Sequence, residues 1–287
     1  MRDFAYFEPA TLDEAVGLLR QYQGSASLLA GGTDLLVQMK EHVRQPAQVI
    51  NIKKIPAMQA LDYDEVTGLL IGALTTTRAV ETSPLVRRHY ASLCRASTDF
   101  ASVQVRNRAT VVGNICRASP SADTLPALIA DGAVLRIQGS DGVRMVQLEE
   151  FFTGAGKTVL NFDEIVTHVT VPPPPPHTGK VYLKHGRRLA MELATVGVAV
   201  SLTLEDGICR AVRIVLAAVA ATPIRAKQAE EVLLNRAIDV KLIAAAAEAA
   251  METARPISDV RASASYRRQM VGVLTRRAIE QALEDAQ

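Results

Sequence analysis

Residues 28–35, with the sequence Leu-Leu-Ala-Gly-Gly-Thr-Asp-Leu, have the composition of a loop that could hold a phosphate group. Gly31 and Gly32 lie between a predicted buried strand and a predicted helix. The backbone there can approach a ligand closely, and successive N–H groups can converge on an anion. Thr33 adds a hydroxyl donor, and a helix that begins near Asp34 would direct its positive end at the phosphate. The pattern is not the Gly-x-Gly-x-x-Gly fingerprint, and an ordinary glycine turn is the alternative.

A second segment of small, hydrogen-bonding residues runs from Thr110 through Gly113 and Asn114 to Asp123. Asp123 could accept two hydroxyl hydrogen bonds from a sugar or polyol. The alternative role for Asp123 is the N-cap of a helix that continues from residue 124, because aspartate favours that position. The two roles are compatible if Ser121 caps the helix.

Lys184 is a third candidate, on a predicted strand that follows a run of prolines. Strand alternation places Tyr182 and Lys184 on one face, where the lysine could pair with an anionic edge of a cofactor. An exposed strand lysine is the alternative. Arg106 and Arg108 are expected in a solvated loop. The histidines have neither metal-ligand spacing nor a neighbouring nucleophile, and they are His42, His89, His168, His177 and His185.

The elements that must position these residues divide at residues 172–176, five consecutive prolines that cannot donate to a sheet. Before the prolines, the predicted strands are residues 27–30, 48–52, 69–73, 133–138, 143–147 and 165–171, with 110–113 as a strand that leads into a turn. The predicted helices there are residues 11–22, 34–40, a helix that starts at 76–81, 85–100 and 123–130. The first helix has a capping box made by Thr11 and Glu14.

After the prolines the pattern changes. Strands are predicted at residues 181–185, 196–204 and 209–218, with an Asp206-Gly207 turn between the last two. Helices are predicted at residues 227–234, 240–253 and 264–283. Three strands followed by three helices indicate an α+β module with its own core.

Length and composition limit the class of protein. The chain has 287 residues, 48% of them apolar and 22% charged, so it can bury a sizeable core. A net charge of +2 gives no reason to expect a nucleic-acid or anionic-membrane partner. Three scattered cysteines argue against a disulfide framework or an iron–sulfur motif, so a redox centre would have to be an organic cofactor. No signal peptide or transmembrane stretch is present, and a cytoplasmic protein is expected.

These segments occur in an order that resembles the FAD-binding medium subunit of the molybdenum hydroxylases. That family includes the middle subunits of carbon monoxide dehydrogenase and of bacterial xanthine-dehydrogenase-like enzymes. The resemblance covers essentially the whole chain. The motifs that carry it are Phe4-x-Tyr6-x-x-Pro9 with Glu14-Ala15, Ala30-Gly31-Gly32-Thr33-Asp34-Leu35, Gln104-Val105-Arg106-Asn107-x-Ala109-Thr110-Val111-Val112-Gly113-Asn114, Ser119-Pro120-Ser121-Ala122-Asp123, and Tyr182-x-Lys184 with Arg187-Arg188.

The resemblance implies an α+β fold in three parts. Residues 1–56 and 57–172 would form the two lobes of a FAD-binding region of the vanillyl-alcohol-oxidase (PCMH) type. Residues 177–287 would form a carboxy-terminal α+β domain with a three-stranded antiparallel sheet and helices.

The resemblance also implies a FAD site in this chain. Residues 28–35 would wrap the pyrophosphate with their N–H groups, and Phe100 would lie on the adenine side. Asp123 would bind ribityl or ribose hydroxyls, Val166 would give a backbone contact near the flavin, and Lys184 would approach the isoalloxazine and stabilise reduced anionic flavin. The cofactor-binding residues carried over are Leu28, Leu29, Ala30, Gly31, Gly32, Thr33, Asp34, Leu35, Phe100, Thr110, Gly113, Asn114, Asp123, Val166 and Lys184.

Two departures from the family pattern bear on function. Some relatives have a tyrosine stacked on the flavin where this chain has Leu193, so flavin access or acceptor preference is expected to differ. The hydroxybenzoyl-CoA reductases carry a cysteine-bearing iron–sulfur insertion in this subunit, and the three dispersed cysteines indicate that this chain lacks it.

The implied function is that of an oxidoreductase subunit that transfers electrons and needs no acid, base, nucleophile or metal ligand of its own. The molybdopterin cofactor and the [2Fe-2S] clusters would belong to a large and a small partner subunit, in a dimer of heterotrimers. The final acceptor would be NAD or a quinone. The alternatives are a stand-alone flavin-dependent oxidase or dehydrogenase of the same fold, and a structural subunit without flavin.

Overall fold

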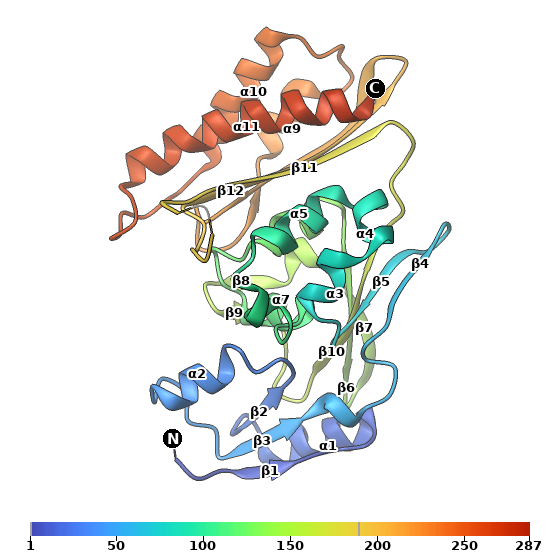
Figure 1. Ribbon diagram of the computed structural model, residues 1–287, viewed down its shortest axis with the longest axis vertical. Coiled ribbons are helices and arrows are strands. Elements are labelled where there is room, and N and C mark those ends of the chain that lie inside the picture. The colour runs from blue at the N-terminus through green and yellow to red at the C-terminus, as the bar shows by residue number, and fades with distance from the viewer. Residues whose placement is uncertain (1, 189) are drawn as a thin grey trace.

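The computed structural model describes residues 2–188 and 190–287. Figure 1 shows three parts in succession along the long axis of the molecule. A small amino-terminal sheet lies at one end, a larger sheet with short helices lies in the middle, and a sheet covered by long helices lies at the other end. No helix within the described residues is long and apolar enough to span a membrane.

The amino-terminal sheet is parallel, so its strands present their carboxyl ends at one edge. Its order is β1 (Ala5–Phe7), β3 (Gln48–Asn51) and β2 (Ala26–Leu29). The chain leaves β2 through the paired glycines and enters α2 (Leu35–Lys40), and it leaves β3 into the 3₁₀ helix η1 (Ile52–Lys54). The glycine loop therefore lies at the carboxyl edge of this sheet, next to the middle part of the molecule.

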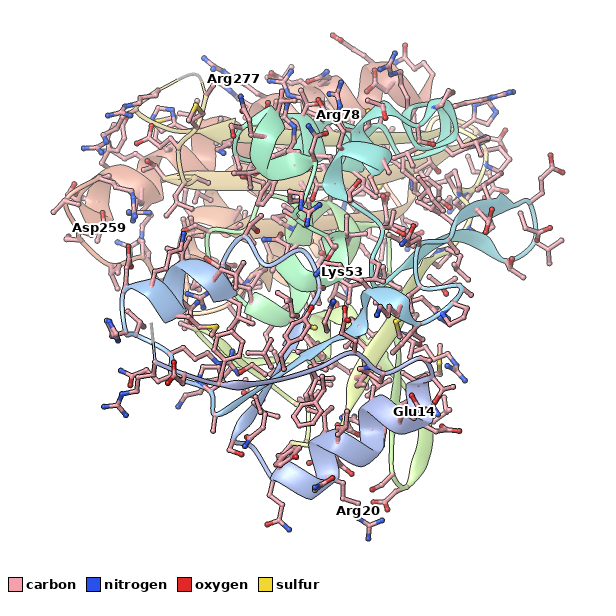
Figure 2. The ribbon with its side chains drawn as sticks, turned by 60° about the horizontal axis from the view of Figure 1, so that its bottom comes forward. Glu14, Arg20, Lys53, Arg78, Asp259 and Arg277 are labelled. Carbon is pink, nitrogen blue, oxygen red and sulfur yellow. The ribbon has the colours of Figure 1, made fainter. Side chains whose placement is uncertain are left out.

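Helix α1 (Leu12–Tyr22) begins with the predicted capping box. The Glu14 N–H donates to Thr11 Oγ1 at 3.2 Å, and the Thr11 N–H donates to Glu14 Oε2 at 3.4 Å. Glu14 and Arg20 mark the course of this helix in Figure 2. Its buried face packs into the main apolar core, so the helix supports the sheet from the side away from the carboxy-terminal domain.

The middle sheet is antiparallel. Its order is β4 (Leu61–Asp64), β5 (Gly68–Gly72), β10 (Ile165–Val171), β6 (Val134–Gly139) and β7 (Gly142–Gln147). The predicted hairpin over residues 133–147 is present, and the strand that enters the prolines lies at the centre of the sheet. After β7 the chain forms a short turn and ribbon, consisting of η2 (Leu148–Glu150), β8 (Phe152–Gly154) and β9 (Lys157–Thr158).

Short helices pack beside this sheet. They are α3 (Thr77–Thr82), α4 (Pro84–His89), α5 (Ala91–Asp99), α6 (Val103–Arg106), α7 (Val111–Arg117) and α8 (Thr124–Ala130). The single helix predicted over residues 85–100 is wrong, because Tyr90 leaves the helical conformation with φ −137° and ψ 58°. Its fully buried hydroxyl lies 3.0 Å from the carbonyl oxygens of both Val171 and Pro172, a long-range contact that no local pattern reveals.

The strand predicted at residues 110–113 is also wrong, because these residues begin α7. Thr110 is the N-cap, and its Oγ1 accepts the Gly113 N–H at 3.0 Å. The β-branched Val111 and Val112 suggest a strand, but both are buried in the core as part of the helix. Capping and packing outweigh their intrinsic preference.

The carboxy-terminal sheet is antiparallel with the order β11 (Thr178–His185), β12 (Val196–Glu205), β13 (Ile208–Ala217) and β14 (Ile224–Arg225). The three predicted strands are present, and the two-residue β14 is an addition that was too short to predict. The helices α9 (Lys227–Leu233), α10 (Val240–Thr253) and α11 (Ala264–Ala286) cover one face, with α11 lying along β11 and β12 (Figure 1).

The other face of this sheet packs on α5 and α8 of the middle part. There, Lys180 Nζ lies 2.7 Å from Asp131 Oδ1, and both side chains are almost completely buried. The same ammonium group lies 4.5 Å from the centre of the Tyr90 ring. Removing either partner of a buried ion pair leaves an uncompensated charge, so this pair favours one way of joining the two parts.

Gly179 provides a test of the packing of α11 on β11. A Cβ atom at Gly179 would lie 1.9 Å from the Ala282 carbonyl oxygen, whereas one at Gly17 within α1 would meet open space. Gly179→Ala is expected to lower the free energy of unfolding by about 1–3 kcal/mol, and Gly17→Ala to raise it by about 0.5–1 kcal/mol. Urea denaturation of the three proteins measures both effects. Equal stability of the two variants would contradict the packing described.

Candidate functional site

A cavity of about 670 Å³ lies where the amino-terminal sheet meets the middle part of the molecule. This volume is within the range of small-molecule and cofactor sites. All of the predicted site residues except Leu29 and Lys184 line it. These lining residues are Leu28, Ala30, Gly31, Gly32, Thr33, Asp34, Leu35, Phe100, Thr110, Gly113, Asn114, Asp123 and Val166. The fold thus brings together segments that are far apart in the sequence, while the contact of each residue with a cofactor stays a prediction.

The first wall of the cavity is the glycine loop, whose backbone donors are free. In the part of the chain that the structure describes, the N–H groups of five consecutive residues, 31–35, make no hydrogen bond. Gly32 has φ +77°, and Asp34, two residues later, lies in the right-handed region. Successive N–H groups in such a loop can face one anion, which is the arrangement called a nest.

Gly31 and Gly113 show why the two loops require glycine. A Cβ atom at Gly31 would lie 2.1 Å from the Arg108 carbonyl oxygen, so the segment before the second loop crosses directly over the first. A Cβ atom at Gly113 would lie 2.7 Å from Thr110 Oγ1, the atom that caps α7. The two loops can therefore lie this close together only with glycine at position 31, and a side chain at position 113 would displace the hydroxyl that caps α7.

The second loop is held in place by hydrogen bonds on both sides. The Val111 N–H donates to the Thr75 carbonyl at 3.2 Å, and the Thr77 N–H donates to the Ala109 carbonyl at 2.8 Å. On the other side, Thr124 Oγ1 donates to Asn114 Oδ1 at 2.7 Å. The carbonyl oxygen of the Asn114 amide is thereby occupied, and its NH₂ group remains as the donor that this residue can offer to a ligand.

Asp123 is a buried carboxylate in the cavity wall. Tyr182 Oη donates to its Oδ1 at 2.8 Å, and Lys184 Nζ lies 2.9 Å from its Oδ2. Burial raises the pKa of Asp123 to about 6, although Lys184 and Tyr182 both act to lower it. A carboxylate has about four acceptor positions, so the two contacts leave capacity for hydroxyl donors of a ligand.

The alternative role of Asp123 as a helix cap is wrong. The residue stands at the N-cap position of α8, but its side chain accepts no hydrogen bond from that helix. The Asp123 carboxylate instead forms an ion pair with Lys184, because an almost fully buried carboxylate gains more from a charged partner than from a neutral N–H group.

Lys184 and Leu29 lie outside the cavity lining. The Lys184 side chain is 11% exposed, so the exposed lysine considered above is excluded, and its Nζ also donates to the Asp99 carbonyl at 3.0 Å. Lys184 thus lies behind Asp123 as seen from the cavity. Leu29 packs against Met39 and Val49, because strand alternation turns it away from the face that Leu28 presents.

Phe100 and Val166 line the cavity from the middle part of the molecule. Phe100 follows α5 and precedes Ala101, which has φ +45°. Val166 lies on β10 at a β-bulge, where the strand changes register between Val166 and His168. A bulge bends a strand locally, and this one lies where β10 passes the cavity.

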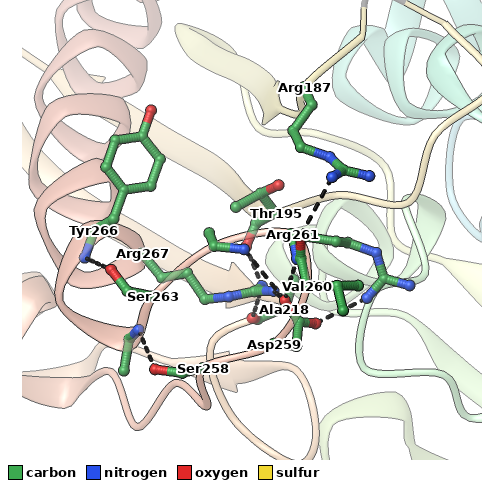
Figure 3. Close-up of polar contacts among 12 residues, drawn as sticks. Arg187, Thr195, Ala218, Ser258, Asp259, Val260, Arg261, Ser263, Tyr266 and Arg267 are labelled. Carbon is green, nitrogen blue, oxygen red and sulfur yellow. Dashed lines mark hydrogen bonds and ion pairs between the residues drawn. The ribbon is translucent and has the colours of Figure 1, made fainter.

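Leu193 lies at the mouth of the cavity with Met191 and Glu192, and its side chain is 48% exposed. This segment is attached to the loop that precedes α11. Arg187 Nε lies 3.1 Å from Glu192 Oε1. Arg187 Nη1 donates to the Val260 carbonyl at 3.3 Å, as Figure 3 shows.

Arg267 anchors the end of the same segment, as Figure 3 shows. This buried side chain of α11 donates to the carbonyl oxygens of Thr195 at 2.6 Å and Ala218 at 3.1 Å, and it lies 2.7 Å from the Asp259 carboxylate. Hydrogen bonds from the Arg261 backbone and the Arg267 guanidinium hold the pKa of Asp259 well below its usual value. The carboxy-terminal domain therefore supports the mouth of the cavity through charged contacts.

Part of the cavity lining was not predicted from the sequence. Arg44 and Arg117 line it, and Arg117 Nε forms an ion pair with Asp34 at 2.7 Å. Loop arginines carry no local signal that separates them from ordinary surface charge. Ser119 and Ser121, which lie within a motif quoted above, also line the cavity.

Arg106 was predicted to lie in a solvated loop, and this prediction is wrong. The residue is 7% exposed and pairs with Glu81, whereas its neighbour Arg108 is exposed as expected. The partner is 25 positions away in the sequence and on another helix, so sequence spacing alone gave no sign of the pair.

Among residues 2–188 and 190–287, no cluster of three or more His, Cys, Asp or Glu side chains could hold a metal ion. The three cysteines are free, with Cys94 and Cys209 buried and Cys116 partly buried.

Two family models match the chain in succession. Residues 2–174 match the FAD binding domain in molybdopterin dehydrogenase, and residues 181–282 match the CO dehydrogenase flavoprotein C-terminal domain. The chain belongs to the FAD-binding subunits of the molybdenum hydroxylases. FAD is therefore the cofactor of this FAD-binding subunit, which is part of an oxidoreductase.

Individual relatives match this FAD-binding subunit over its full length. The xanthine dehydrogenase FAD-binding subunit of Escherichia coli O157:H7 is 36% identical over 290 residues, which cover 100% of this chain and 98% of the relative. The carbon monoxide dehydrogenase medium chain of Hydrogenophaga pseudoflava is 34% identical over 97% of this chain and 96% of its own.

Solved structures confirm the predicted fold class. A chain of carbon monoxide dehydrogenase from Hydrogenophaga pseudoflava superposes with a TM-score of 0.95 at 35% identity and covers 99% of this chain and 98% of its own. A chain of quinoline 2-oxidoreductase from Pseudomonas putida 86 gives a TM-score of 0.92 at 29% identity, with 99% and 98% covered. The FAD-binding region followed by a carboxy-terminal α+β domain is thus the architecture of this subunit.

The cavity of this FAD-binding subunit suits FAD chemically. The free N–H groups of residues 31–35 match the charge of a pyrophosphate, and the glycines leave room for it to approach the backbone. Asp123 offers acceptors to hydroxyl groups, and Arg44 adds positive charge to the wall, whereas the charge of Arg117 is balanced by Asp34.

Asp123→Asn is expected to change how the stability of the FAD-free subunit depends on pH. The pKa of Asp123 is raised to about 6 in the fold from about 3.9 in an unfolded chain. The unfolded state therefore binds fewer protons between about pH 4 and pH 6, and the wild type loses stability as the pH rises through this window. Asparagine does not titrate, so this loss of stability is absent in the Asp123→Asn variant.

Urea denaturation of both FAD-free proteins from pH 4.5 to pH 7.5 measures the effect. The stability of the wild type minus that of Asp123→Asn should fall by about 2 kcal/mol across the range. A constant difference would show that folding does not shift the pKa of Asp123, and a difference that rises with pH would show that folding lowers it; either result would contradict the raised pKa.

Proposed function

We propose that this subunit takes electrons from [2Fe-2S] clusters of a small partner subunit, holds them on FAD and passes them to an external acceptor. A large partner subunit with a molybdopterin cofactor would oxidise the organic substrate. The observation that carries the proposal is the row of free N–H groups at residues 31–35. It lines a cavity in a chain that matches xanthine and carbon monoxide dehydrogenase flavoprotein subunits over its whole length.

The residues of the cavity have separate roles in this proposal. The N–H groups from Gly31 to Leu35 bind the pyrophosphate, with Leu28, Leu29, Ala30, Gly32, Thr33 and Asp34 forming that loop. Thr110, Gly113 and Asn114 form the second phosphate loop. Asp123 accepts hydroxyl groups of the cofactor, Phe100 lies on its adenine side, and Val166 contributes a backbone contact near the flavin.

Lys184 acts on the electrostatics of the site. Its ammonium group is buried and lies behind Asp123, so water screens its charge only weakly. The Asp123 carboxylate offsets most of this charge, and the field that remains favours reduced anionic flavin through Coulomb attraction. FAD supplies the redox chemistry, and the chain contributes binding, orientation and this charge.

The proposed assembly draws on the relatives. Medium chains of carbon monoxide dehydrogenase are similar to this chain in sequence and fold, which supports a complex with a large and a small partner subunit. A dimer of such heterotrimers is proposed as its arrangement. We propose NAD or a quinone as the acceptor and the cytoplasm as the location. Within the chain, residues 1–56 and 57–172 are proposed as the two FAD-binding lobes and 177–287 as the carboxy-terminal domain.

Gly32→Ala tests the FAD site. Gly32 and Gly24 both have positive φ, +77° and +84°, but Gly24 lies in a turn outside the cavity. Alanine costs about 1–2 kcal/mol in this conformation at either position, so Gly24→Ala is the control for backbone strain, and only the Cβ atom at Gly32 would also meet a side chain, at 2.9 Å from Leu29 Cδ1. We expect yellow wild-type protein with a flavin spectrum, at least tenfold weaker FAD binding in Gly32→Ala, and wild-type binding in Gly24→Ala. A colourless wild type that refuses added FAD would exclude the proposed site.

A reconstitution experiment tests the proposed path of electrons. The subunit is purified alone and in complex with the large and small subunits, and bleaching of its flavin absorbance is followed after addition of the substrate of the complex. Bleaching is expected only in the complex, because the electrons must arrive from a partner. Direct reduction of the isolated subunit by the organic substrate would instead indicate a stand-alone flavin oxidase or dehydrogenase.

A further inference from the structure

The guanidinium group of Arg106 connects two elements beside the cavity. Its Nε and Nη2 lie 2.8 and 3.2 Å from the two carboxylate oxygens of Glu81 on α3, in a side-on bidentate ion pair. Its Nη1 donates to the carbonyl oxygens of Phe100 at 2.8 Å and Ala101 at 3.2 Å. All three nitrogens are thus engaged, one side with a carboxylate and the other with two successive carbonyl groups.

The residues that Arg106 holds belong to the cavity wall. Phe100, Ala101 and Ser102 line the cavity, whereas Arg106 and Glu81 do not. Ala101 has φ +45°, a left-handed conformation that is unfavourable for alanine. A residue keeps such a conformation only when its surroundings impose it. The two hydrogen bonds from Arg106, on the carbonyls of this residue and the one before it, are a direct means of doing so.

Glu81 is suited to hold the guanidinium in one orientation. Its carboxylate is largely buried and also lies 3.0 Å from Arg78. Burial alone would raise the pKa of Glu81, but Arg106 and Arg78 outweigh that effect and hold it below its usual value. The carboxylate therefore stays ionised at neutral pH. Lysine could not replace Arg106 here, because an ammonium group cannot form the planar, two-pronged pair with a carboxylate.

We propose that Arg106 and Glu81 are positioning residues for FAD, which fix the wall formed by Phe100, Ala101 and Ser102 without touching the cofactor. This inference rests on the proposed FAD site. The same wall is held from the other side by Lys184, which donates to the Asp99 carbonyl. Together, Arg106 and Lys184 therefore bind the carbonyl oxygens of three successive residues, Asp99, Phe100 and Ala101.

Arg78 provides the matched control. It lies on α3 (Figure 2) and pairs with the same Glu81 carboxylate, but its side chain is 40% exposed and does not line the cavity. If Arg78, Glu81 and Arg106 only stabilise the fold, the loss of either arginine should weaken FAD binding only as far as it lowers the stability of the protein. A positioning role predicts that Arg106 matters for FAD beyond its effect on stability.

The experiment compares Arg106→Lys, Glu81→Gln and Arg78→Ala in the full-length subunit. FAD is removed, and FAD affinity is measured by titration together with the thermal midpoint of the FAD-free protein. Arg106→Lys is expected to weaken FAD binding at least tenfold and Glu81→Gln severalfold. Arg78→Ala should bind FAD within twofold of the wild type. Hydrogen exchange should be faster at residues 99–103 in Arg106→Lys and unchanged there in Arg78→Ala.

Several outcomes would overturn the inference. Wild-type FAD affinity in both Arg106→Lys and Glu81→Gln would do so, as would losses of affinity that follow the losses of thermal stability in all three variants. If Arg106→Lys does not fold, unchanged affinity in Glu81→Gln is sufficient. If the wild type itself does not bind FAD, the proposed FAD site is wrong. If the wild type binds FAD but the variants give the results above, only the positioning role of Arg106 and Glu81 is wrong.

Discussion

Two buried carboxylates at the ends of α8 determine how the carboxy-terminal sheet meets the rest of the molecule. Asp123 precedes the helix and Asp131 follows it, and each pairs with a lysine of β11, Lys184 and Lys180 respectively. The helix between the two carboxylates spans about 12 Å, and four residues of strand span about 13 Å. Both pairs therefore form together in one register of strand on helix, and a slip would leave buried charges without partners.

This constraint also links the carboxy-terminal domain to the FAD site. Asp123 lines the cavity, while the lysine and tyrosine that satisfy it come from β11. The domain thus completes an ion pair at the cofactor site, with the carboxylate in the cavity wall and the lysine outside the lining. The amino-terminal sheet contributes the opposite feature, a row of backbone N–H groups with no partner of their own. One part of the site thus contains an ion pair that is already formed, Asp123 with Lys184, and another contains backbone N–H groups that can bind an anion.

Local patterns predicted much of this arrangement. Paired glycines between an apolar strand and a helix indicated the anion loop, alternation placed Tyr182 and Lys184 on one face, and the capping box marked the start of α1. The errors arose where distant contacts overrode local preference. Tyr90 interrupts a helix, and its hydroxyl contacts the carbonyl oxygens of Val171 and Pro172 at the start of the prolines. Thr110 caps a helix whose two valines suggested a strand. The partner of Arg106 lies on another helix, which no spacing rule could reveal.

By itself, the sequence determined the element types of most segments, the break at the prolines, the resemblance to a flavoprotein subunit and the residues that could form a FAD site. These follow from glycine freedom, periodicity and motif order, which are properties of short segments. Only the tertiary structure decided that Asp123 is an ion-pair partner rather than a cap, that Lys184 lies behind it, and that Arg106 holds the cavity wall. Each of these depends on burial, and burial results from the packing of segments that are distant in the chain.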